Sequence, residues 1–134
     1  MINGIKPTYI KETNYGIAMD SFLTKVTSNT IEYFNERYDN LPKPEYVINK
    51  GRRFDKIVRV DSSKSVYCFI EKETGNIYKA AGWRAPYLNG NNPIRGNLYD
   101  TNSYQNADPH GSWLYVWIIS INPNNIHIFM GYSS

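Results

Sequence analysis

Apolar residues between Thr13 and Tyr38 recur at spacings of three and four positions, a pattern typical of an amphipathic helix. We expect one face of this helix to pack on a sheet, because its β-branched residues have weak intrinsic helix propensity. Thr13 or Asn14 is the expected N-cap, and the run Asn40–Pro44 should end the helix, since proline cannot continue it. The apolar stripe consists of Met19, Leu23, Val26, Thr30 and Tyr33, widened by Phe22 and Phe34.

After the prolines the pattern changes to one that is typical of strands. Strands are expected at Tyr46–Ile48, at Phe54–Val60 and at Val66–Glu71. In the third of these, residues 66, 68 and 70 would share one face and residues 67, 69 and 71 the other, because side chains alternate along a strand. Both of its faces carry large apolar residues, so this strand is expected to be central in the sheet.

The segment Glu71–Asn76 predicts a hairpin loop, since it places Thr-Gly between two β-prone runs. Gly75 is expected to have a positive φ, as a type I turn followed by a bulge requires. Ile77–Ala81 would then return as the antiparallel partner of the preceding strand.

The C-terminal third of the sequence divides into a loop and a second hairpin. Residues 82–111 are rich in Asn, Gly and Pro and show no sustained period, so they predict a long irregular loop of the kind that often carries function. Trp113–Ile121 and Ile126–Tyr132 predict two paired strands around a turn. The whole pattern predicts an α+β fold, with one N-terminal helix packed on a mostly antiparallel sheet of about five strands.

Composition narrows the class of protein further. The chain has 134 residues, enough for the single domain 1–134, and its 41% hydrophobic and 15% aromatic content excludes a disordered chain. The net charge of +3 is compatible with a nucleic-acid or phosphate-bearing partner. A single cysteine, no signal-like start and no long apolar run predict synthesis in a reducing compartment and no membrane partner.

Residues that could perform catalysis are few. Cys68 is expected mid-strand on an apolar face, which favours an inert buried thiol. His127 is expected to face outwards from a strand, and His110 lies in a loop where Asp108 could orient it. No metal-ligand spacing and no glycine-rich phosphate loop is present, so we expect no metal, no cofactor and no enzyme activity. An enzyme remains the weakest alternative and would require Asp108, His110 or Cys68 to converge in one pocket.

Positive charge and aromatic residues gather around the central hairpin in the sequence. In an antiparallel sheet these residues could meet at one end, where guanidinium groups would hold phosphates and a ring would stack on bases. The alternative is that Trp83 packs the loop onto the core while the arginines lie in solvent. The candidate ligand-binding residues are Arg52, Arg53, Lys79, Trp83, Arg84, Arg95 and Asn97.

Residues 65–97 also contain a recognisable motif. A β-prone run and a Thr-Gly turn precede Lys-Ala-Ala-x-Trp-x-Ala-Pro at 79–86 and Arg-Gly-Asn at 95–97. This order resembles a family of small uncharacterised proteins of tailed bacteriophages and large DNA viruses, over about residues 20–97. The stretch Tyr87–Pro93 departs from the family pattern as an insertion, and the C-terminal hairpin is not associated with the family. The resemblance implies a viral source and assigns no activity.

Two interpretations of function follow. The first is a small viral accessory protein with a non-catalytic binding role, whose partner is nucleic acid or a nucleotide-type ligand. The second is a virion structural or assembly component that packs against other viral subunits through Tyr- and Trp-rich surfaces. Either would place the protein in the host cytoplasm or in the virion. The sequence does not indicate one oligomeric state.

Overall fold

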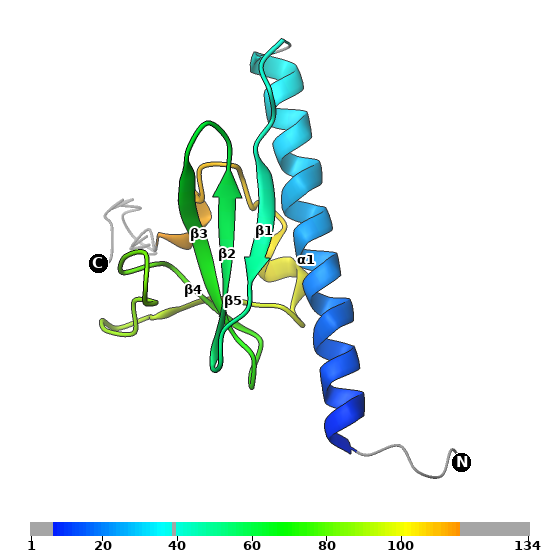
Figure 1. The fold of residues 1–134 in the computed structure, drawn as a ribbon, viewed down its shortest axis with the longest axis vertical. Coiled ribbons are helices and arrows are strands. Elements are labelled where there is room, and N and C mark those ends of the chain that lie inside the picture. The colour runs from blue at the N-terminus through cyan, green and yellow to red at the C-terminus, as the bar shows by residue number, and fades with distance from the viewer. Residues whose placement is uncertain (1–6, 39, 116–134) are drawn as a thin grey trace, which may run out of the picture.

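The computed structural model describes residues 7–38 and 40–115 as one long helix followed by an antiparallel sheet (Figure 1). The strands pair in the order of the sequence, each antiparallel to the next. The predicted α+β class is therefore confirmed. The elements are α1 (Pro7–Arg37), β1 (Glu45–Asn49), β2 (Phe54–Val60), β3 (Lys64–Glu71), β4 (Asn76–Tyr78), β5 (Ile94–Asn97) and the short 3-10 helices η1 (Thr101–Tyr104) and η2 (Ser112–Leu114).

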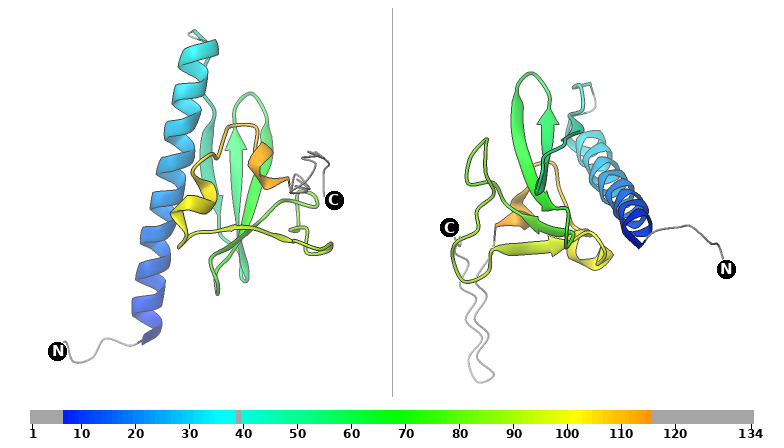
Figure 2. Two further views of the ribbon diagram at one scale, coloured as in Figure 1. Left: turned by 180° about the vertical axis from the view of Figure 1, so that it is seen from behind. Right: turned by 60° about the horizontal axis from the view of Figure 1, so that its bottom comes forward.

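α1 lies along one side of the sheet and presents its predicted apolar stripe to it (Figure 2). The hydroxyl groups of Thr30 on α1 and Tyr46 on β1 lie 2.7 Å apart and form a hydrogen bond across this interface. Burial of the stripe gives the helix the stability that its β-branched residues do not supply. The helix-side core contains Met19, Phe22, Val26, Ile57, Tyr67, Cys68, Ile70, Ile77, Leu98, Tyr104, Ala107 and Leu114.

The helix is longer at its start than the sequence predicted. It begins at Pro7, whose fixed φ suits a first helical turn, so Thr13 and Asn14 lie inside it and neither is the N-cap. The polar run Lys11–Asn14 interrupts the apolar period, and for this reason the period alone placed the helix start too late. The helix ends at Arg37, shortly before the proline-containing run, as expected.

β3 is the central strand, as predicted, and its pairing with β2 contains a β-bulge. Cys68 pairs with Ile57, and the register then shifts so that Tyr67 is the extra residue on β3. The prediction that Tyr67 shares a face with Phe69 is therefore wrong. Tyr67 packs in the helix-side core next to Cys68, whereas Phe69 contacts Phe54 on the opposite face of the sheet.

The predicted hairpin loop between β3 and β4 is confirmed. Gly75 has a φ of 78°, and its N–H donates a hydrogen bond of 2.7 Å to the Glu71 carbonyl. β4 is shorter than the predicted strand Ile77–Ala81, because beyond it the chain forms a small hairpin of its own. In this Lys79–Tyr87 hairpin the Tyr87 N–H donates to the Lys79 carbonyl at 2.9 Å.

The region predicted as one long loop contains regular structure. β5 lies within residues 82–111 and pairs with β4, and η1 follows it. Trp113 and Leu114 belong to η2, so the start of the predicted strand Trp113–Ile121 is wrong. Residues 116–121 of that strand and the whole of Ile126–Tyr132 lie outside the described residues.

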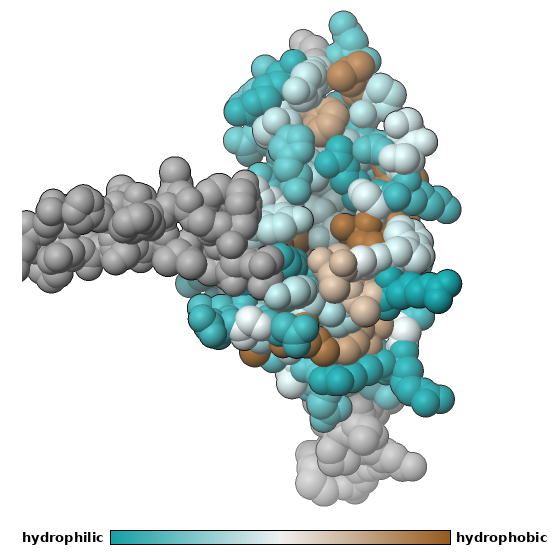
Figure 3. Space-filling model, turned by 90° about the vertical axis from the view of Figure 1, so that its left-hand side faces the viewer, coloured by the Kyte–Doolittle hydropathy of each residue, from teal (hydrophilic) through white to brown (hydrophobic). Residues whose placement is uncertain are grey.

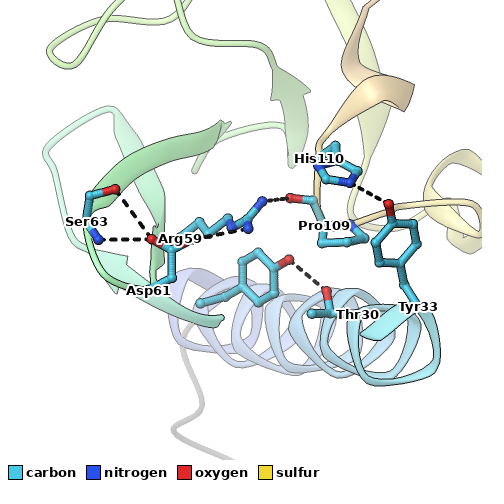
Figure 4. A network of polar contacts seen from close by, with 8 residues as sticks. Thr30, Tyr33, Arg59, Asp61, Ser63, Pro109 and His110 are labelled. Atoms are coloured by element: carbon cyan, nitrogen blue, oxygen red, sulfur yellow. Dashed lines mark hydrogen bonds and ion pairs between the residues drawn. The ribbon is translucent and has the colours of Figure 1, made fainter. Parts of the chain in front are cut away.

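Polar contacts join the segment 105–111 to the helix and the sheet (Figure 4). Arg59 at the end of β2 donates to the Pro109 carbonyl, and His110 Nε2 lies 2.8 Å from the Tyr33 hydroxyl of α1. The Tyr67 hydroxyl donates to the Asp108 carbonyl at 2.6 Å. This loop is therefore fixed from two sides. In the described part of the chain, no helix has the length and apolarity needed to cross a membrane.

Candidate functional site

The outer face of the sheet, which points away from α1, carries an exposed tryptophan next to a lysine. Phe54 and Lys56 alternate along β2 with the core residue Ile57, so both lie on this face. Trp83 lies in the turn of the Lys79–Tyr87 hairpin, and 47% of its surface is exposed. Lys56 Nζ lies 3.9 Å from the centroid of the Trp83 ring and donates a 2.9 Å hydrogen bond to the Trp83 carbonyl. The lysine therefore covers part of an indole that otherwise reaches solvent.

Phe54 continues this surface towards the start of β2. Its ring makes edge-to-face contacts with Phe69 of β3 and Tyr78 of β4, with centroids 6.5 and 5.8 Å away. The guanidinium carbon of Arg53 lies 4.8 Å from the centroid of Phe54. Cations and aromatic rings thus lie next to one another along the outer face.

Arg84 adds a further cation, because it follows Trp83 in the hairpin turn and is exposed. The side of the molecule opposite to α1 is the one seen in Figure 3, where apolar residues are bordered by strongly hydrophilic ones. We use the term Trp83 surface for the five residues Arg53, Phe54, Lys56, Trp83 and Arg84.

One carboxylate partly balances the positive charge of this surface. Glu71 accepts hydrogen bonds from the Thr74 hydroxyl at 2.7 Å and from Arg53 Nε at 3.0 Å. The Thr74 bond above all, and then Arg53, hold the pKa of Glu71 below its usual value. Glu71 is therefore ionised at neutral pH, and it fixes the orientation of the Arg53 guanidinium.

Lys79 and Arg95 form a separate cluster with two tyrosines. Lys79 Nζ lies 4.7 Å from the ring centroid of Tyr87 and 4.9 Å from that of Tyr115. Arg95 donates a hydrogen bond to the Asn92 carbonyl. Burial and the nearby Arg95 charge lower the pKa of Lys79, and burial lowers the pKa of Arg95. These two predicted ligand residues are thus brought together, but apart from Trp83.

The two remaining predicted residues lie elsewhere. Arg52 lines a groove with the N-terminal half of α1. The Asn97 side chain donates to the Thr74 carbonyl and to Asn76 Oδ1, and its own Oδ1 accepts from the Tyr99 N–H at 2.8 Å. Asn97 therefore joins the end of β5 to the β3–β4 turn. The seven predicted residues do not form one site, and three of them lie in the Trp83 surface.

The sequence-based set omits Lys56, which makes the closest cation contact with Trp83. A signal for it exists, since Lys56 is two residues from Phe54 and strand alternation places both on one face. The contact with Trp83, however, depends on how the Lys79–Tyr87 hairpin folds over the sheet, and no local pattern predicts that.

The residues weighed for catalysis lie in different surroundings. Cys68 is buried, and burial raises the pKa of its thiol. The Asp108 carboxylate accepts from the Ser112 N–H at 3.0 Å and from its hydroxyl, whereas His110 pairs with Tyr33. Within residues 7–38 and 40–115, no group of His, Cys, Asp and Glu side chains is arranged to hold a metal ion.

Comparison with known proteins gives one match. A model described as a family of unknown function (DUF7717) matches residues 9–116, which include all of α1 except its first two residues, all strands described above and the Lys79–Tyr87 hairpin. No curated protein and no solved structure matches the chain.

Proposed function

Because the chain belongs to DUF7717, a family of unknown function, we propose from the geometry of its surface that it is a non-catalytic binding protein for nucleic acid or a nucleotide-type ligand. The Trp83 surface is the proposed binding site. The observation that carries the proposal is an exposed indole with a lysine ammonium 3.9 Å from its ring and an arginine next to it in the chain.

Such a surface offers both contacts that a nucleotide needs. An exposed ring stacks on a base, and this contact is worth about 1–3 kcal/mol per base. Lys56, whose ammonium group lies 3.9 Å from the ring centroid, and the exposed Arg84 supply charged donors for phosphate oxygens. Arg53 is oriented by Glu71 and extends the cationic edge along β2. The combination favours ligands that carry bases and phosphates together.

Fluorescence anisotropy with a labelled single-stranded oligonucleotide tests the proposal. Trp83→Ala should weaken binding by about 5- to 150-fold, the equivalent of one lost base stack, whereas Trp83→Phe should retain most of the affinity. Because Trp83 is half exposed, both variants should keep the wild-type melting temperature. An affinity that is indifferent to salt, or equal in wild type and Trp83→Ala, would contradict the proposal.

A second candidate function is a component of an assembly, and exposed apolar residues support it. Leu88, Ile94 and Tyr99, which lie between the Lys79–Tyr87 hairpin and η1, are 44%, 50% and 51% exposed. Such residues suit contacts with other subunits. The motif at 79–86 supports the finer proposal of a viral accessory or virion protein. Proteomics of purified virus particles distinguishes these roles, since absence from particles excludes the virion role.

A further inference from the structure

We propose that the Trp83 surface continues into a cationic groove next to α1. The ligand is then an extended single strand of nucleic acid that contacts both the Trp83 surface and this groove. This inference rests on the proposed nucleic-acid function and specifies its ligand further. The groove is lined by Lys11, Glu12, Tyr15, Arg52, Lys72 and Glu73.

The groove lies where three segments meet. α1 contributes Lys11, the β1–β2 connection contributes Arg52, and the β3–β4 turn contributes Lys72. Its volume is about 440 Å³, within the range of about 300–1,000 Å³ that is usual for ligand pockets. Tyr15 forms part of the wall, and its hydroxyl is fixed by a 2.8 Å hydrogen bond to Asp55. The groove is therefore large enough for part of a nucleotide, and its Tyr15 wall is fixed by a hydrogen bond to the sheet.

The backbone connects the groove directly to the Trp83 surface. The Lys72 N–H donates a 3.0 Å hydrogen bond to the Arg53 carbonyl, and Lys72 Nζ lies 3.2 Å from the Gly51 carbonyl. Arg52 and Arg53 are consecutive, with Arg53 over the Phe54 ring on the outer face and Arg52 in the groove next to α1. The two arginines thus join the groove next to α1 to the cationic outer face of the sheet.

The length of this path sets the size of the ligand. Arg52 and Lys56 are four positions apart, so the path between them measures at most about 13 Å at a rise of about 3.3 Å per residue. A stacked strand advances about 3.4 Å per nucleotide, so this distance corresponds to about four nucleotides. With one more at each end, at Trp83 and at Lys11, the site holds about six.

The charges of the groove are suited to phosphates. Three cations face two carboxylates, and one of these carboxylates, Glu73, forms an ion pair with Lys11. The side chains of Lys11 and Glu73 are 49% and 78% exposed, so their ion pair is weak. A phosphate group can therefore replace Glu73 as the partner of Lys11. When a strand enters, Lys11 therefore becomes available to bind its phosphate in place of Glu73.

The shape of the path favours a single strand over a duplex. It leads from the outer face, around the end of β2, to the side of the sheet where α1 packs. A duplex has a persistence length of about 150 base pairs and does not bend around such an edge within a few nucleotides. A single strand turns freely between stacked bases.

The test compares oligothymidylates of about three and about eight nucleotides in anisotropy titrations at several salt concentrations. The longer ligand should bind at least about 10-fold more tightly, and its logarithmic salt slope should be about −4 against about −2, given about −0.7 per phosphate contacted. Replacing Arg52 and Lys72 together with alanine should weaken the longer ligand by about 10-fold and leave the shorter one unchanged. Lys64→Ala is the matched control, because Lys64 is an exposed cation at the opposite end of β3.

Each outcome decides a different claim. Equal affinities and equal salt slopes for both lengths would overturn the groove next to α1 and leave the Trp83 site intact. Tighter binding of a duplex of the same length would overturn the single-strand ligand. No binding of either length, in wild-type protein at low salt, would remove the proposed function and this inference with it. Arg52→Ala alone repeats the test if the double variant does not fold.

Discussion

Replacing Gly75 with alanine should destabilise the protein by about 1–2 kcal/mol, because the turn between β3 and β4 requires a left-handed residue. Gly75 has a φ of 78°, and L-residues with a side chain meet a steric penalty of about that size there. An added Cβ would also lie 2.7 Å from Cε2 and 2.9 Å from Cδ2 of Tyr99. Tyr99 is half exposed, so its ring can move aside, and the backbone penalty decides the magnitude.

Thermal unfolding followed by circular dichroism measures this effect. A loss of about 1–2 kcal/mol should lower the melting temperature by about 3–10 °C in a domain of this size. Gly82→Ala is the matched control, since a Cβ there meets nothing within 4 Å and the φ of Gly82 is not positive. Adding Tyr99→Ala to Gly75→Ala removes the contact and isolates the backbone penalty.

Two results would refute this reasoning. Equal melting temperatures for Gly75→Ala and Gly82→Ala would show that the turn does not depend on a positive φ. A full recovery of stability in the double variant would show that the Tyr99 contact, and not the backbone, carries the cost.

Two further predictions concern α1 and the carboxylate of the outer face. Gly16→Ala should stabilise the protein by about 1 kcal/mol, since Gly16 is an exposed residue inside α1 with open space around it; a lower melting temperature would contradict this. The folded pKa of Glu71 is lowered, so the stability it contributes is present above its unfolded pKa and lost as pH falls through the folded value. Glu71→Gln should therefore reduce the loss of stability on acidification, measured as the free energy of unfolding from denaturant titrations at several pH values. An equal dependence of this free energy on pH in the variant and the wild type would argue against the prediction.

The sequence predicted elements well where a β-prone run is bounded by turn-favouring residues. Phe54–Val60 is found with the predicted bounds, because this β-prone run follows Gly51 closely and ends at the polar run 61–63. β5 was missed, because Ile94–Asn97 is short and contains a glycine and an asparagine, residues of low β-propensity. It forms a strand because β4 offers an unpaired edge, which is information from outside the segment.

The candidate site was predicted in its residue types and only partly in its arrangement. Trp83 is exposed next to cations, as one of the two sequence interpretations required. Arg52 and Arg53 were placed in one group because they are adjacent in sequence, yet they extend to different sides of the sheet. The sequence shows that both side chains are positively charged. Their directions depend on where β2 begins and on how α1 packs against the sheet.

The extra residue in β3 has a consequence for how this protein can vary. Tyr67 faces the core only because of the register shift, and its hydroxyl accepts from Trp113 Nε1 at 2.8 Å while it donates to the Asp108 carbonyl. Deleting one residue here would regularise the ladder but would leave an indole N–H and a main-chain oxygen without their shared partner. Related chains should therefore keep the irregular strand and the phenol together, or replace both together.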